Sequence, residues 1–181
     1  MWQLPITVTP AAAEPILLAD AKEYLRIDAG DTGFDSELAV HISSARERAE
    51  VTTGTRLITQ VVEVRADSFA DLAHLPIGPV QTLDEIRYLD SAGAEQLLDP
   101  LLYELQGAEL NRAVAPAIGT SWPSAYVRAG AVRVVLTVGY GDDGAAVPPA
   151  IMIAMLREIR AVFDDTSFDI EPLLRSFRIW A

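Results

Sequence analysis

The sequence contains no cysteine and only two histidines, His41 and His74. Without cysteine there is no disulfide framework, no thiolate zinc site and no cysteine nucleophile. His41 lies in a helical pattern in which the i+4 position is Ala45, so it lacks a second ligand at metal-binding spacing. His74 lies in a loop, and the sequence supplies no partner for it. We therefore expect neither a metal ion nor a cofactor.

Basic residues are scarce, with 14 Lys and Arg against 26 Asp and Glu, which gives a net charge of −12. Proteins that grip DNA irrespective of sequence need the opposite sign, because they neutralise phosphates. No segment approaches the roughly 18 apolar residues of a membrane span. The first residues carry no Lys or Arg, unlike a signal peptide. We expect a protein made in a cytoplasm, with neither tight DNA binding nor a membrane anchor.

Motifs for catalysis are also lacking. Residues 138–141 (VGYG) have no following Lys-Ser/Thr, so a turn at the end of a strand is favoured over a phosphate loop. Two pairs of carboxylates, Asp142-Asp143 and Asp164-Asp165, adjoin glycine or a helix end and are interpreted as solvated turns. Ser43-Ser44 and Ser121 have no nucleophile-elbow context. The sequence predicts that the protein is not an enzyme.

Half of the residues are apolar, which is enough for a sizeable core, and their spacing predicts helices over residues 16–54. A short amphipathic helix comes first, and a longer one follows the break at Gly30 and Gly33. Asp35 is the expected N-cap of the longer helix, and Gly54 is expected just after its end. Its apolar stripe consists of Leu38, Ile42, Ala45 and Ala49.

The middle of the chain, residues 57–140, reads as strands. Residues 60–65 are rich in β-branched side chains, and residues 83–89 form a second expected strand before a turn at 90–93. Residues 95–98 and 101–105 are expected to be short return strands. Residues 132–138 give the strongest alternation. A last helix over 148–165 then opens with two prolines, so the predicted fold class is α+β.

The C-terminal segment, residues 166–181, is unusually apolar for the end of a chain. Two interpretations stay open: the segment folds back on its own core, or it is an arm that docks on another subunit. In the docking interpretation the arm carries apolar anchors and basic side chains for an acidic partner. These candidate contact residues are Leu173, Leu174, Arg175, Phe177, Arg178 and Trp180.

The order of these segments resembles that of phage head–tail connector proteins, also called adaptor or head-completion proteins. The resemblance spans nearly the whole chain. It is carried by residues 18–28 (LADAKEYLRID), 45–50 (ARERAE), 53–57 (TGTRL), 75–80 (LPIGPV), 122–123 (WP), 138–141 (VGYG), 147–151 (VPPAI), 173–174 (LL) and 177–178 (FR). The alanine-rich composition would suit a gene transfer agent or prophage of a GC-rich bacterium.

The resemblance implies a single connector domain over residues 1–181, with a helical core and an inserted antiparallel β region. It implies a ring of about a dozen copies in the neck of a particle assembled in the bacterial cytoplasm. The ring would lie between the portal protein and a tail-side neck or stopper protein. DNA would pass through it without specific binding, and the C-terminal arm would dock on the portal or on a neighbouring subunit.

Two other functions remain open at this point. One is a small α+β binding module that acts as a monomer or dimer, with its C-terminal segment folded back. The other is a metal-assisted hydrolase that uses the acidic pairs. The sequence leaves the copy number, the tail-side partner, the host and the residues that line a channel undetermined.

Overall fold

The computed structural model describes residues 1–179 and has the α+β fold that the sequence predicts. The chain forms two compact units. The β unit comprises residues 1–10, 60–139 and Ile179, and the helical unit comprises residues 11–59 and 140–178. The β region is therefore an insertion close to the expected 57–140. The first ten residues also belong to the β unit, which the sequence did not predict.

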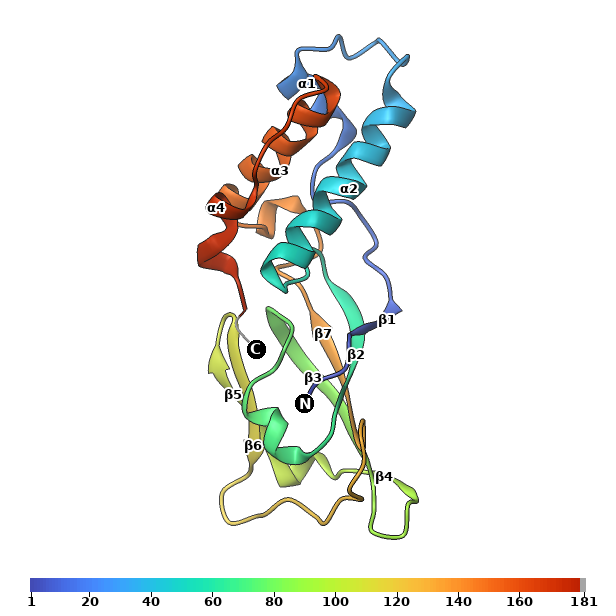
Figure 1. Ribbon diagram of the computed structural model, residues 1–181, viewed down its shortest axis with the longest axis vertical. Coiled ribbons are helices and arrows are strands. Elements are labelled where there is room, and N and C mark those ends of the chain that lie inside the picture. The colour runs from blue at the N-terminus through green and yellow to red at the C-terminus, as the bar shows by residue number, and fades with distance from the viewer. Residues whose placement is uncertain (180–181) are drawn as a thin grey trace. The chain divides into compact units, whose positions relative to one another are not determined.

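The helical unit contains α1 (Leu18–Leu25), α2 (Asp35–Thr53), α3 (Pro149–Phe163) and the one-turn α4 (Glu171–Leu174). Helices α2 and α3 lie side by side (Figure 1). The predicted stripe on α2 is buried as expected, and it packs with apolar side chains of α3 such as Ile151, Met155 and Ile159. Burial of this shared core is the main stabilising contribution in the unit.

The two ends of α2 show one confirmed prediction and one wrong one. Gly54 ends the helix with a left-handed backbone (φ 72°), and its N–H donates to the Glu50 carbonyl at 2.9 Å. Asp35 is not the N-cap, because Phe34 occupies that position and Asp35 is the first helical residue. The Asp35 carboxylate forms an ion pair with Lys22 of α1 instead.

The β unit is built on a five-stranded antiparallel sheet with strand order β1-β2-β7-β3-β4. The strands are β1 (Ile6–Thr9), β2 (Gln60–Ala66), β3 (Val80–Leu89), β4 (Glu95–Leu97) and β7 (Val132–Val138). The strongest predicted strand, β7, is the central one. Its alternate residues Val132, Val134, Leu136 and Val138 are fully buried on one face.

Two parts of the β unit differ from the prediction. Residues 100–102 form a 3-10 turn, and the strand that follows, β5 (Tyr103–Ala108), pairs with β6 (Asn111–Pro116) as a separate two-stranded ribbon. Strand β6 was not predicted from the sequence. In the core of the β unit, the rings of Phe69 and Trp122 stack with their centroids 4.8 Å apart, so aromatic packing supplements the aliphatic core.

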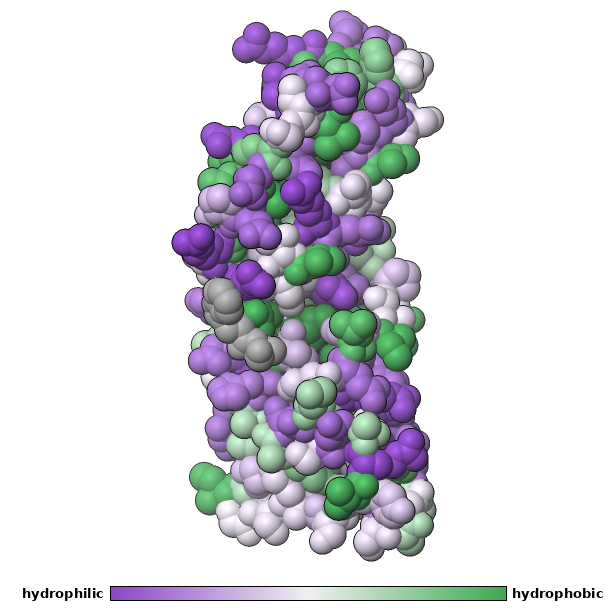
Figure 2. Space-filling model, viewed as in Figure 1, coloured by the Kyte–Doolittle hydropathy of each residue, from purple (hydrophilic) through white to green (hydrophobic). Residues whose placement is uncertain are grey.

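Figure 2 shows polar side chains over most of the visible surface, with apolar residues exposed in separate places. Within residues 1–179 no helix is both long and apolar enough to span a membrane.

Candidate functional site

The C-terminal segment is folded onto the helical unit as far as Arg178. The Thr166 N–H donates to the Ala161 carbonyl at 2.7 Å, which turns the chain back after α3. Ile170 and Leu174 are fully buried in the core of the helical unit. A short 3-10 turn, Arg175–Phe177, follows α4. Up to Arg178, the segment is an integral piece of the helical unit.

The structure separates the six predicted contact residues into two groups. Leu174 is 0% exposed and Phe177 packs partly against the same core, so these two stabilise their own unit. The expectation that Leu174 is an exposed anchor is therefore wrong. Leu173 is 37% exposed, and Arg175 and Arg178 are exposed. Trp180 lies outside the described residues.

A stripe of exposed residues on α2 is a further candidate for contacts, and the sequence pattern did not predict it. It consists of Val40, Ser44, Glu47 and Val51, which are spaced by four, three and four residues and so share one helix face. Val40 is 64% exposed and Val51 is 82% exposed, although both are aliphatic. The signal was available in the sequence, because two valines eleven residues apart repeat after three helical turns. This face, together with Leu173 of α4 and the exposed Arg175 and Arg178 that follow it, is the candidate contact surface of the helical unit.

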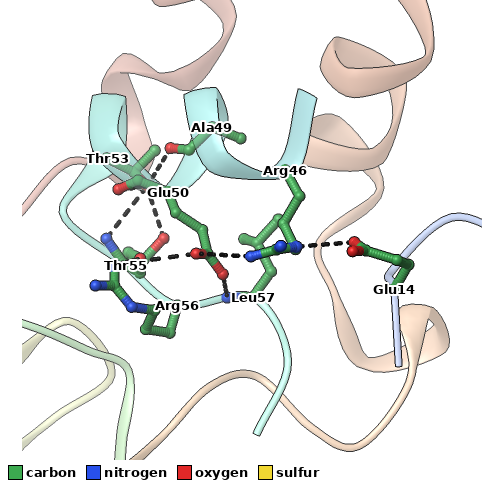
Figure 3. A network of polar contacts seen from close by, with 8 residues as sticks. All are labelled: Glu14, Arg46, Ala49, Glu50, Thr53, Thr55, Arg56 and Leu57. Carbon is green, nitrogen blue, oxygen red and sulfur yellow. Dashed lines mark hydrogen bonds and ion pairs between the residues drawn. The ribbon is translucent and has the colours of Figure 1, made fainter. Parts of the chain in front are cut away.

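A polar network fixes the chain where it leaves α2 (Figure 3). One oxygen of the Glu50 carboxylate accepts the Leu57 N–H at 2.9 Å, and the other lies 3.4 Å from Arg46 Nη1. Arg46 Nε also donates to Glu14 at 2.8 Å, so the network reaches the segment before α1. Arg56 Nη1 lies 4.0 Å from Glu50 and adds a second positive charge.

Burial raises the pKa of Glu50, although the Leu57 N–H and the two arginines oppose the shift. The side chain of Glu50 is almost fully buried, although it is a carboxylate. Its partners are backbone and arginine groups of the same unit, and this arrangement holds the turn after α2 in place. The network is structural, and it ties three segments to one carboxylate.

Three other residues considered in the sequence have partners within the chain. His41 Nε2 lies 3.3 Å from Glu37 one turn earlier on α2. The His74 carbonyl accepts the Trp2 indole N–H at 3.0 Å. Asp143 accepts the Ala145 N–H at 2.9 Å and so caps a short 3-10 turn. In the part of the chain that the structure describes, no three His or acidic side chains cluster to hold a metal ion.

Comparison with solved structures shows where this architecture has been seen before. One chain from the neck of an empty gene transfer agent (GTA) particle, computed with C6 symmetry, superposes with a TM-score of 0.78. The match covers 99% of this chain and 97% of the other at 21% sequence identity. The chain has the fold of a GTA neck protein. Both units are included in this likeness, because it covers almost the whole of each chain.

Two further GTA structures share the fold over the same 99% of this chain and 97% of theirs, again at 21% identity. A chain from the virion of the native particle has a TM-score of 0.76. A chain from the neck of the native particle, computed with C12 symmetry, has a TM-score of 0.70. No protein-family model and no curated protein sequence matches this chain.

Proposed function

We propose that this protein is a non-enzymatic structural subunit of the neck of a tailed phage or gene transfer agent. In this proposal its copies form a ring between the portal protein and a tail-side neck or stopper protein, and DNA passes through the ring. The protein is assembled into the particle in the bacterial cytoplasm. The observation that carries the proposal is the end-to-end likeness to a chain of a GTA neck, at a TM-score of 0.78.

The chemistry of the chain agrees with this role. A conduit for DNA must avoid gripping the duplex, and a net charge of −12 disfavours tight, sequence-independent binding. The two GTA necks were computed with C6 and C12 symmetry, which is the symmetry of rings. A ring of about a dozen copies of this chain is therefore part of the proposal.

The candidate contact surface of the helical unit would serve the contacts to the portal or to the neighbouring subunit. Val40 and Val51 expose apolar surface along α2, and such surface is stabilised when a partner covers it. Arg175 and Arg178 would supply polar contacts to an acidic partner. Leu173 would add an apolar contact beside them. Repetition around a ring multiplies weak contacts through a high effective concentration.

Reconstitution with portal-bearing heads that lack this protein tests the proposal. We expect electron microscopy to show copies of the chain in a ring on the portal, and tails to attach only when the chain is added. The double variant Val40→Glu/Val51→Glu should reduce attachment. Val127→Glu, which changes an exposed valine of the β unit, is the matched control. Heads that join tails equally well without the chain would contradict the proposal.

A further inference from the structure

Three arginines stand in one row across the β unit's sheet. In the register of the sheet, Arg133 of the central strand β7 lies opposite Arg65 of β2 on one side and Arg87 of β3 on the other. Residues in such a row point to the same face of a sheet. Like charges directly opposite one another destabilise a sheet, so this row has an electrostatic cost that its surroundings must offset.

Two glutamates, Glu63 and Glu85, offset the repulsion among the arginines. Glu63 accepts hydrogen bonds from Arg65 Nε at 2.7 Å and from Arg133 Nη1 at 3.0 Å. Glu85 accepts from Arg133 Nη2 and from Arg87 Nε, both at 3.2 Å. These carboxylates therefore restrain the guanidinium groups of the row.

Hydrogen-bonding capacity remains on the arginine row. In the described chain, Arg133 Nε is buried without a hydrogen bond, and it lies 3.7 Å from a carboxylate oxygen of Glu95. A guanidinium carries five N–H donors, so an arginine held by one or two carboxylates can still donate to another group. The two outer arginines of the row remain accessible, since the side chains of Arg65 and Arg87 are 44% and 34% exposed, and they can donate to a further anionic partner.

A cavity of about 400 Å³ opens beside this row. Its lining includes Arg65, Arg87, Arg133 and a fourth arginine, Arg128, together with Glu95. Arg128 is exposed and has no ion-pair partner among residues 1–179. Four arginines and one glutamate therefore line the same small space, in a chain with twelve more negative than positive charges.

We propose that this arginine pocket binds the carboxylates of an acidic segment from another protein. Fixed guanidinium groups recognise carboxylates through paired, charge-assisted hydrogen bonds. DNA is the less suitable ligand, because a duplex is held by positive charges spread along many phosphates. Here the positive charges converge on one pocket, and Glu63 and Glu85 lie in the adjacent row of the sheet.

A labelled acidic peptide tests the pocket in the full-length protein. The probe is fluorescein-labelled hexaglutamate, and fluorescence anisotropy at low salt measures its Kd. We expect saturable binding that weakens at least tenfold in Arg65→Gln/Arg128→Gln and weakens as salt is raised to about 0.15 M. Arg128→Lys should retain only part of the affinity, because lysine lacks the bidentate geometry.

Two controls make the outcome decisive. Arg157→Gln removes one exposed arginine from α3 of the other unit and should leave the Kd unchanged. Thermal unfolding followed by circular dichroism verifies that each variant is folded. Absence of saturable peptide binding, or an equal Kd in all variants, would overturn the proposal. It would also be overturned if a labelled DNA duplex bound through the same arginines while the peptide did not.

Discussion

The carboxylate of Glu50 and the backbone N–H of Leu57 are joined by a 2.9 Å hydrogen bond across seven residues. The bond spans the end of α2 and the turn that follows it. The bond helps to fix the path of the chain out of the helix, because a buried N–H without an acceptor is costly.

We predict that Glu50→Ala destabilises the helical unit by about 2–4 kcal/mol, since it leaves the Leu57 N–H and Arg46 without their buried acceptor. Glu50→Gln should cost less, because the amide oxygen still accepts a hydrogen bond and needs no desolvation of a charge. Urea unfolding followed by circular dichroism at neutral pH measures both effects. Glu47→Ala, on the exposed face of the same helix, is the control and should change little.

We predict that Glu63 stabilises the β unit at neutral pH and that this contribution is lost in acid. Burial opposes the ionised form, but hydrogen bonds from Arg133 and Arg65 outweigh it and hold the pKa of Glu63 below its ordinary value of 4.5. The contribution is therefore complete above that value and disappears as the pH falls through the lower folded-state pKa. In urea titrations between pH 6 and pH 3, Glu63→Gln should show a shallower loss of stability than the parent protein.

The pKa of Glu50 is raised, whereas that of Glu63 is lowered, so the two glutamates should respond to pH in opposite directions. Its ionised form is penalised by burial, so this penalty is present above the raised pKa and is relieved as the pH falls. Glu109→Gln changes an exposed glutamate and serves as the control for both sites. If Glu63→Gln and Glu109→Gln gave the same pH profile, the assigned role of Glu63 would be wrong.

We predict that neighbouring leucines of α4 have separable roles. Leu174→Ala should destabilise the helical unit by about 2–5 kcal/mol, because it removes a fully buried side chain. Leu173→Asp should leave stability nearly unchanged but reduce attachment to portal-bearing heads. Unfolding curves and a head-binding assay on the two variants distinguish these effects. Equal attachment by Leu173→Asp and the parent protein would remove this residue from the proposed contact surface.

We predict that Gly144→Ala destabilises the helical unit by at least about 1–3 kcal/mol. A Cβ atom at this position would lie 1.9 Å from the Pro15 carbonyl oxygen, so the backbone must move. Gly30→Ala is the matched control, because the nearest atom to its added Cβ is the flexible Asp28 carboxylate at 3.2 Å. Thermal unfolding compares the two variants, and similar melting temperatures would show that the Pro15 contact relaxes without cost.

The sequence predicted the elements in which the spacing of apolar residues agrees with the residues that begin or end the element. Strand β7 alternates apolar and polar residues, and α2 combines an apolar stripe with Gly54 at its end, so both were found with nearly correct bounds. Strands β1 and β6 were missed, because neither is a long β-branched run. Strand β1 depends on a partner distant in the chain, such as Glu63 for Ile6, whereas β6 pairs in a hairpin with the preceding strand β5.

The candidate sites were less predictable, since they depend on which side chains the fold covers. The sequence could not decide between a folded-back segment and a free arm, and burial of Ile170 and Leu174 decided it for the described part. The arginine pocket was not found either. Arg65, Arg87 and Arg133 are scattered over the sequence, and only the strand register places them in one row.

Lys22 is the only lysine among the 181 residues, and it is 5% exposed. Its ammonium group is bonded to the Asp31 carbonyl at 2.7 Å and paired with Asp35, so a protease that cleaves only after lysine meets a single, shielded target. Cleavage then requires the region around α1 to open. The rate of digestion by such a protease therefore reports local opening of this helix. The rate can be measured on the native protein without any label or mutation.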